Sequence, residues 1–500
     1  MRKRITTVLI AFLAIVMSAT AQAQNPTSGT AGPLTWKYDT GTKTLTISGK
    51  GDMPNYTRKD PAPWQDHNRE MQKLVVEEGV TGIGDYAFEH ADNLISVTLP
   101  KTATRIGDRS FVVCKGLPTI SIPAGVIKIG PAAFGDCESL TSVTLPDGLK
   151  EIAHIAFTMC YELATVTIPS SVETIGTGAF SDCFNLSAIT VAAGNANYVA
   201  VDGVLFNKAK TTLLQYPAGR ADTSYVIPAE VTSIKEQSFD GARRLTSVKF
   251  PAGLVSIEDY AFTGCSALNA ITIPAAVKTI THDAFIHMQS LTEITVEDTN
   301  TAYASVEGVL FDKTKTRLIK YPQGRPAASY TIPAGVTTID TYSFGNVKKL
   351  SSIRLPSSVK EIRSTAFYGC KSLKNITVGA KTPPAINENE NVFGQVPVAN
   401  VTLTVPKGAK AAYAAAPVWK EFKQISESTV GNVTLPEARI YAADGRLYLT
   451  LQTAAPVGIY TLNGVLVRTF SASAGETTVA LPQGVYIVRV GDTAEKVMVE

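Results

Sequence analysis

The sequence lacks most of the features that identify enzymes and metalloproteins. Its 500 residues include five histidines and three tryptophans. They contain no HExxH zinc motif, no nucleophile elbow and no glycine-rich phosphate loop. The histidines do not fall at the spacing of metal ligands, apart from His282 and His287, which flank Phe285 on the apolar side of its repeat. The sequence therefore predicts no catalytic, cofactor-binding or metal-binding residue.

Charge and long apolar segments are also scarce. Charged residues make up 18% of the chain, and the formal net charge is +3. No run of like charge and no stripe of lysine and arginine is present, so nucleic acid is not expected as a partner. Beyond the N-terminal region, no segment is apolar enough to predict a transmembrane helix.

The N-terminal segment, 1–23, is predicted to be a secretory signal peptide. Arg2 to Arg4 supply the positive segment, and Val8 to Met17 supply an apolar segment that is too short to span a bilayer. Ala21 to Ala23 then offer the small residues that a signal peptidase needs. No cysteine follows the apolar segment, which argues against a lipoprotein anchor. The protein is therefore expected to leave the cytoplasm.

A 23-residue period runs through most of the remaining chain. The segment IGDYAFEHADNLISVTLP, which begins at Ile83, recurs as IGDRSFVVCKGLPTISIP from Ile106 and as IGPAAFGDCESLTSVTLP from Ile129. Further copies begin at Ile152, Ile175, Ile234, Ile257, Ile280, Ile339 and Ile362. Ten copies at one spacing indicate a solenoid, in which each unit buries its apolar face only by stacking on its neighbours.

The pattern inside one copy predicts a short helical turn followed by a strand. In the copy from Ile129, the apolar residues of the first part fall on one face of a helical turn; they are Ala133, Phe134, Cys137 and Leu140. The second part, SVTLP, alternates polar and apolar residues as a half-buried strand does, and its proline ends the strand. The expected fold is a mainly β solenoid with short helical turns.

Each copy contains one phenylalanine at the same position, and these form a column: Phe88, Phe111, Phe134, Phe157, Phe180, Phe239, Phe262, Phe285, Phe344 and Phe367. Such a row could serve as an aromatic platform for ligands. Every copy, however, places the ring on the apolar side of the pattern. We therefore expect core residues, each contributing about 1.5–3 kcal/mol through burial.

All six cysteines occupy one repeat position, three residues after the phenylalanine: Cys114, Cys137, Cys160, Cys183, Cys265 and Cys370. Other copies hold alanine, methionine or valine there, so the position is interpreted as a packing position filled by free thiols. Disulfides between neighbouring coils are the alternative, because coils stacked at about 4.8 Å would bring the cysteines close enough.

Two copies carry an insertion, near residues 192–226 and 297–331. The segment YVAVDGVLFNKAKTTLLQYPAGR from Tyr198 is echoed, 105 residues later, by YASVEGVLFDKTKTRLIKYPQGR. Each is predicted to form a β-hairpin with a polar tip. Exposed tyrosine and arginine are common at binding hot spots, so the candidate binding residues here are Lys208, Lys210, Tyr216, Arg220, Lys313, Lys315, Tyr321 and Arg325. The alternative is that the hairpins only widen two coils.

The outward-facing positions of the repeated strands provide a second candidate surface. They are rich in threonine and serine and nearly free of charge, and their representatives are Thr144, Thr167 and Thr190. A ladder of hydroxyls offers hydrogen bonds to an extended protein or glycan. The alternative is that threonine is present only because it favours exposed strands.

The repeat unit IGxxAFxxCxxLxxVxLP resembles the BspA-type leucine-rich repeat of bacterial surface antigens. The hairpin motif GVLFNKxKTxLxxYP, the stretch LTWKYDTGTKTLTISGKGDMPNY with PAPW, and the ending LTVPKGAKAAYAAAPVWKEF are similar to that family as well. The resemblance covers roughly residues 30 to 426. It implies a leucine-rich repeat fold and a surface protein that binds other proteins.

The C-terminal segment, 437–500, resembles the C-terminal sorting domain of type IX secretion cargo, through IYTLNGVLVRTF, LPQGVYIVRVG and KVMVE. Such tails usually end in a basic residue, whereas this chain ends in Glu500. The resemblance implies export across the outer membrane, with the protein attached at the cell surface or released.

The expected domains are a signal peptide (1–23), an N-terminal β cap (24–75), the solenoid (76–426), a linker (427–436) and a β-sandwich sorting domain (437–500). The expected function is that of a non-enzymatic surface adhesin or interaction scaffold for host matrix proteins or other cells. Glycan binding for nutrient capture is the alternative, although the outward columns lack the tryptophan and tyrosine on which sugars stack. An exported enzyme is a third possibility, with no motif behind it.

Overall fold

The computed structural model describes residues 26–281, 283–387, 389–428, 438–443, 445–451, 454–490 and 493–499. The predicted signal peptide, most of the predicted linker and His282 lie outside these ranges. The described chain divides into two compact units that interleave in sequence. Unit 1 comprises residues 26–161 and 171–176, and unit 2 comprises residues 162–170 and 177–499.

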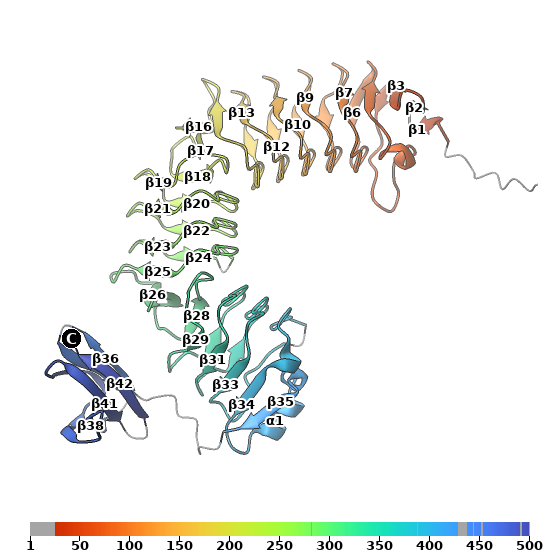
Figure 1. The fold of residues 1–500 in the computed structure, drawn as a ribbon. Coiled ribbons are helices and arrows are strands. Elements are labelled where there is room, and N and C mark those ends of the chain that lie inside the picture. Colours follow the sequence, from red (N-terminus) through yellow and green to blue (C-terminus); the bar gives the residue numbers. More distant parts are fainter. Residues whose placement is uncertain are drawn as a thin grey trace, which may run out of the picture. The chain divides into compact units, whose positions relative to one another are not determined.

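Unit 1 is built from short strands that pair mainly in parallel (Figure 1). One sheet has the order β1 (Ser28–Ala31), β2 (Leu34–Asp39), β3 (Thr44–Gly49), β5 (Lys73–Val76) and β7 (Ser96–Thr98). A second has the order β14 (Thr174–Ile175), β12 (Glu151–Ile152), β10 (Lys128–Ile129), β8 (Arg105–Ile106), β6 (Val80–Ile83) and β4 (Gly51–Asp52). The third pairs β9 (Thr119–Ser121) with β11 (Ser142–Thr144). A 3-10 helix, η1 (Gln65–His67), precedes β5.

Unit 2 continues the same pattern around two antiparallel insertions. Its first sheets are β13 (Thr165–Ile168) with β15 (Ala188–Val191), and β16 (Tyr198–Val201), β17 (Val204–Asn207), β18 (Thr212–Gln215), β20 (Ser233–Ile234), β22 (Ser256–Ile257) and β24 (Thr279–Ile280). Two small parallel sheets are β19 (Ser224–Val226) with β21 (Ser247–Lys249), and β23 (Ala270–Ile273) with β25 (Glu293–Val296).

The later coils of unit 2 form two five-stranded sheets. One has the order β26 (Tyr303–Val306), β27 (Val309–Asp312), β28 (Arg317–Lys320), β30 (Thr338–Ile339) and β32 (Glu361–Ile362). The other has the order β29 (Ser329–Thr331), β31 (Ser352–Leu355), β33 (Asn375–Val378), β34 (Thr402–Val405) and β35 (Gln424–Glu427). Three short helices accompany its end: η2 (Val398–Asn400), α1 (Lys410–Ala415) and η3 (Trp419–Glu421).

Residues 438–499 form two antiparallel sheets. The first contains β36 (Ala438–Ala443), β37 (Arg446–Leu451) and β40 (Gly475–Ala480). The second has the order β39 (Leu466–Ala472), β38 (Ala455–Thr461), β41 (Gly484–Val490) and β42 (Thr493–Val499). Inward residues of both sheets, among them Leu449, Ile459 and Val488, make one shared apolar core.

The 23-residue period sets the register of the parallel ladders. Ile129 pairs with Ile106 on one side and with Ile152 on the other. Since paired residues are one repeat apart, each repeat position faces its own copies in the neighbouring coils. The predicted mainly β solenoid is therefore confirmed.

The segment around each phenylalanine is a turn, and the predicted short helical turn is not a helix. No helix occurs among the described residues between 83 and 378. In the copy from Ile129, Ala132 and Asp136 have φ angles of 51° and 59°, which a right-handed helix cannot contain. Backbone N–H groups bond to the next coil instead, as Phe134 does to the Ala156 carbonyl at 2.8 Å. The apolar spacing was read correctly, because Ala133, Cys137 and Leu140 are all buried.

The phenylalanine column is core, as predicted. In unit 1, successive rings from Phe88 to Phe157 stack with centroids 5.1, 5.3 and 5.2 Å apart, and each ring is fully buried. The column starts on Trp64, whose ring stacks on Phe88 at 5.8 Å and whose Nε1 donates to the Ala87 carbonyl. In unit 2, Trp419 contacts Phe393 edge-on at 5.8 Å. Each unit therefore has an indole ring at one end of its aromatic column.

The six cysteines are buried and free, which supports packing over disulfides. Thiols directed along the stack to the preceding coil are those of Cys114, Cys137, Cys160, Cys265 and Cys370. Cys137 Sγ lies 3.2 Å from the Phe111 carbonyl oxygen, and Cys265 Sγ lies 3.2 Å from that of Phe239. Burial raises the pKa of the Cys370 thiol to about 12, so it stays neutral and unreactive at physiological pH.

Candidate functional site

The two insertions are antiparallel hairpins, as predicted, but they are packed into the solenoid. In the first, β16 pairs with β17 and β17 with β18, and β18 then pairs in parallel with β20. Val204, Leu205 and Phe206 are fully buried. The second hairpin repeats this pairing with β26, β27, β28 and β30. The tips, residues 208–211 and 313–316, carry exposed or half-exposed side chains, and the outer strands β16 and β26 are mostly half-exposed.

Tyr216 and Tyr321 are core residues, and the prediction that they are exposed is wrong. Tyr216 has 1% of its surface exposed, and Tyr321 has none. Each ring stacks on the phenylalanine of the next coil, at 5.1 Å for Tyr216 and Phe239. The two tyrosines therefore fill the phenylalanine position of the hairpin coils. Burial raises the pKa of Tyr216 to about 12.

Arg220 and Arg325 are half-exposed and bond within the hairpins, and their role in binding stays a prediction. Arg220 Nη1 donates to the Asp202 carbonyl, and Arg325 Nη1 donates to the Glu307 carbonyl. The Arg220 side chain is 17% exposed, and its Nε lies 2.7 Å from Asp222 Oδ2. These bonds satisfy a carbonyl at the β16–β17 and β26–β27 turns, and the guanidinium groups are engaged within the fold.

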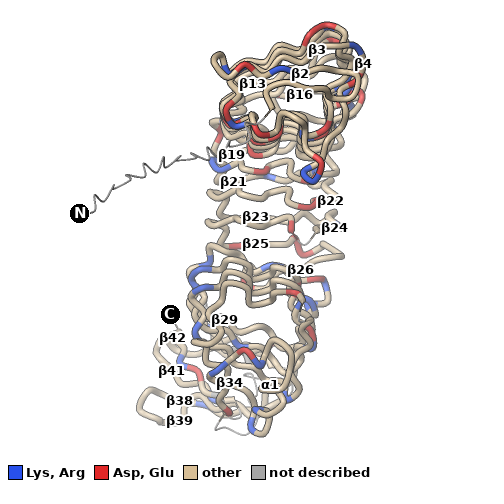
Figure 2. Tube along the Cα trace, turned by 90° about the vertical axis from the view of Figure 1, so that its right-hand side faces the viewer, with Lys and Arg blue, Asp and Glu red and all other residues tan. Residues whose placement is uncertain are grey.

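The lysines are the part of the predicted hairpin surface that faces solvent. Lys208 and Lys313 are exposed, although their Nζ atoms reach the carbonyls of Asn195 and Asp298 at 2.7 and 3.2 Å. Lys315 is exposed and Lys210 is half-exposed. In Figure 2, charges of both signs are scattered along the tube, without a stripe of lysine and arginine.

Within each unit, the outward strand positions present a row of hydroxyls, and we name these rows the hydroxyl face. It consists of Thr98, Ser121 and Thr144 in unit 1 and of Thr167, Thr190, Thr272 and Thr295 in unit 2. All are exposed except Thr295, which is half-exposed. Neighbouring hydroxyls bond to each other, at 2.8 Å for Thr167 and Thr190 and at 3.0 Å for Thr295 and Thr272. The predicted outward orientation of Thr144, Thr167 and Thr190 is confirmed.

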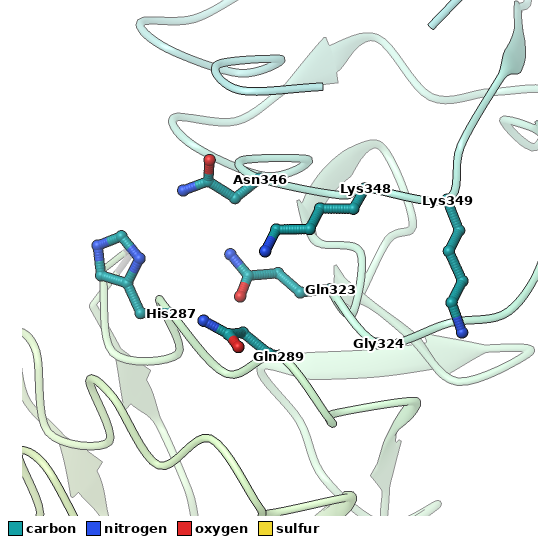
Figure 3. Close-up of a pocket in the computed structure, with 7 residues that line it drawn as sticks. All are labelled: His287, Gln289, Gln323, Gly324, Asn346, Lys348 and Lys349. Atoms are coloured by element: carbon teal, nitrogen blue, oxygen red, sulfur yellow. The ribbon is translucent and has the colours of Figure 1, made fainter. Parts of the chain in front are cut away.

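A pocket of about 290 Å³ lies in unit 2, in the turns that follow three successive core rings. Its lining comes from the Phe285 coil (His287, Gln289), the Tyr321 coil (Gln323, Gly324) and the Phe344 coil (Asn346, Lys348, Lys349) (Figure 3). Sequence reasoning missed this pocket. The repeat places these residues at equivalent positions, but only the three-dimensional stacking shows a hollow between them.

Among the described residues, no group of three or more histidine, cysteine, aspartate or glutamate side chains is placed to hold a metal ion. No helix in the same residues is long and apolar enough to cross a membrane.

The model for a BspA-type leucine-rich repeat region matches six copies, over residues 67–200, 221–326 and 323–396, which together exceed half of the chain. Among solved structures, a leucine-rich repeat protein from Eubacterium ventriosum matches with 24% identity and a TM-score of 0.53, over 82% of this chain and 98% of its own. Its likeness supports the fold. No curated protein matches at a significant level.

Two further solved structures are similar. A leucine-rich cell surface protein from Faecalibacterium prausnitzii has 26% identity and a TM-score of 0.42, with 74% of this chain and 98% of that chain covered. The pneumococcal vaccine antigen PcpA has 18% identity and a TM-score of 0.43, with 81% of this chain and 99% of that chain covered.

Proposed function

Because the chain belongs to the BspA-type leucine-rich repeat family, we propose that it is a non-enzymatic adhesin or interaction scaffold at the cell surface. Its partners would be host matrix proteins or the surfaces of other cells, bound through the solenoid. A stacked solenoid offers one long, repetitive surface, which suits an extended partner better than a small substrate.

The hydroxyl face is the observation that carries this proposal. Its side chains are short and uncharged and lie in register on paired parallel strands, so they present hydrogen-bond donors and acceptors at little desolvation cost. The hairpins now contribute less than their sequence suggests, because their tyrosines and arginines are engaged within the fold. The exposed lysines at the tips remain as a secondary, electrostatic contribution.

Replacing Thr167, Thr190 and Thr272 together by valine is expected to weaken binding to the partner protein by about tenfold or more. Valine keeps the shape and the strand preference but removes the hydroxyls, which are worth about 0.5–1.5 kcal/mol each. Binding would be measured on a panel of immobilised host serum and extracellular matrix proteins, with the mature full-length chain.

The matched comparison is a variant with glutamate at Lys208, Lys210, Lys313 and Lys315. Its loss should be smaller and should shrink as salt is added, because exposed charges are screened. If the valine variant binds as the wild type does and the glutamate variant loses binding, the hairpin tips are the contact surface. If no panel protein is bound, the adhesin proposal fails.

We also propose that residues 437–500 are a type IX secretion sorting domain and that residues 1–23 direct export. The separate apolar core of the C-terminal strands supports an independent tail. Deleting residues 437–500 is expected to leave the protein in the periplasm, which fractionation of the producing cells would detect. Surface display of the shortened chain at the wild-type level would refute the sorting role.

Glycan binding is the second candidate function. The observation that favours it is the amide-rich pocket of unit 2, because primary amides are suited to pairing with sugar hydroxyls.

A further inference from the structure

The hairpin coil lies close to the preceding coil beside the pocket. Gly324 N–H donates to the Leu291 carbonyl at 2.7 Å. A Cβ atom on Gly324 would lie 2.6 Å from the backbone carbon of Ser290, so only glycine allows this approach. The turn after Tyr321 is thereby held against the preceding coil.

The first hairpin makes the same approach, but there side chains occupy the corresponding space. Gly219 N–H donates to the Leu186 carbonyl at 2.9 Å. The counterparts of Gln289 and Lys348, 105 residues earlier, are Phe184 and Arg243, and the Arg243 guanidinium lies 3.6 Å from the centroid of the Phe184 ring. The chain therefore contains two copies of one site, with a cation–π pair in the first and amide and ammonium groups in the second.

Gln323 gives the second copy an unmet hydrogen-bonding requirement. Its side chain is 6% exposed, and its Nε2 donates to the Gly345 carbonyl at 2.7 Å. That bond fixes the amide, and its buried Oε1 has no partner among the described residues. A buried acceptor without a donor costs about 1–3 kcal/mol, so a ligand that donates a hydrogen bond here gains affinity. The first copy has Ala218 at this position.

Charge and further amides surround that oxygen. Figure 3 shows the ends of Gln289, Gln323 and Lys348 turned toward the same space, whereas Lys349 runs away from it. Neither lysine forms an ion pair with the described part of the chain. Asn346 is oriented by a hydrogen bond from its Nδ2 to the Tyr342 hydroxyl. Burial, together with the nearby Lys320, lowers the pKa of His287, so its ring is neutral at pH 7.

We propose that this pocket binds one acidic sugar residue of a glycan chain. The ammonium of Lys348 would pair with the carboxylate or sulfate of the sugar, and the amides of Gln289 and Asn346 would pair with its hydroxyls. A sugar hydroxyl would donate to Gln323 Oε1. The pocket volume of about 290 Å³ is at the lower end for small-ligand pockets, which suits a single ring.

An acidic peptide side chain fits this pocket less well. An ionised aspartate or glutamate side chain offers only acceptors, so it could pair with Lys348 but could not satisfy Gln323 Oε1. A sugar ring with an acidic group offers both donors and acceptors. This inference rests on the second candidate function, glycan binding. It involves none of the residues of the hydroxyl face, so the pocket proposal and the adhesin proposal can fail independently.

Calorimetric titration of the mature full-length chain tests the proposal. The acidic probes are glucuronate, N-acetylneuraminate and glucose 6-sulfate, with glucose as the neutral counterpart and glutarate, which offers only acceptors, as an acidic probe without a ring. We expect at least one acidic sugar to bind and glucose to bind about tenfold more weakly or not at all. Binding of glutarate equal to that of every acidic sugar would assign the pocket to acidic peptide side chains instead.

Three variants locate the binding. Lys348→Gln and Gln323→Ala are each expected to lower the affinity for the acidic sugar by about tenfold. Gln289→Phe should fill the pocket and abolish binding. Ala and Phe occupy the equivalent positions of the first copy, so both are compatible with the fold, which thermal melts would confirm. Lys360→Gln removes one exposed lysine outside the pocket and outside the hairpin tips, and it should leave the affinity unchanged. Failure of all acidic sugars to bind at millimolar concentration, or unchanged affinity in all three variants, would overturn the proposal.

Discussion

Replacing Tyr216 by alanine is expected to lower the free energy of unfolding by about 3–5 kcal/mol. The ring is 1% exposed and stacks on Phe239 at 5.1 Å, with Tyr225 at 5.0 Å beside it. Its removal would leave a cavity inside the aromatic column, next to a hairpin whose own packing depends on that column. Urea denaturation of the mature chain would measure the change.

The control is Tyr216→Phe, which keeps the ring and removes a hydroxyl that has no hydrogen-bond partner among the described residues. This variant should stay within about 1 kcal/mol of the wild type. A tyrosine that faced solvent as a binding residue would behave differently, because alanine would then cost little stability. A loss below about 1 kcal/mol in Tyr216→Ala would thus restore the exposed interpretation.

The repeat made most of the solenoid predictable. Ten copies at one spacing imply coils in register, and Ile129 indeed pairs with Ile106 and Ile152. The apolar positions of each copy are the buried ones, because a residue that recurs in every coil faces its own copies. The turn around each phenylalanine was less predictable. Apolar spacing alone does not distinguish a helical turn from a turn with left-handed residues such as Asp136.

The hairpin tyrosines were misjudged, although the sequence contains the signal that places them. Tyr216 precedes Phe239 by one full repeat period, and Tyr321 precedes Phe344 by the same interval. They continue the phenylalanine column through the insertions. Their neighbours Lys208 and Arg220 suggested a polar loop, but the repeat period was the stronger indicator. The pocket could not be predicted in this way, because it depends on how the turns of three stacked coils pack and not on the repeat period alone.

The burial of Lys320 is a second feature that the sequence pattern does not predict. It ends β28 with 2% of its surface exposed, where the first hairpin has Gln215. Its Nζ donates to the Tyr342 carbonyl at 3.1 Å and lies 4.9 Å from the centroid of the Tyr342 ring. Burial lowers the pKa of Lys320 to about 7, although Asp283 and Cys370 act in the opposite direction.

The sign of the effect on stability follows from this lowered pKa. Between pH 7 and the usual lysine pKa near 10.4, the unfolded chain holds a proton that the folded chain has lost. Folding is therefore penalised most at and below pH 7, where the ammonium must be buried. The penalty disappears as the pH rises toward the pKa of the unfolded chain.

Lys320→Met is accordingly expected to gain stability relative to the wild type at pH 6 to 7. This difference should shrink by about 2–3 kcal/mol between pH 7 and pH 9.5, because one pKa unit corresponds to about 1.4 kcal/mol. Urea melts of both chains at several pH values would measure it, and other titrating groups cancel in the difference. Gln215→Met is the matched control: it alters the equivalent buried position without a charge and should show a difference that does not depend on pH. A Lys320→Met difference that is equally independent of pH would mean that the amine keeps an ordinary pKa and reaches water.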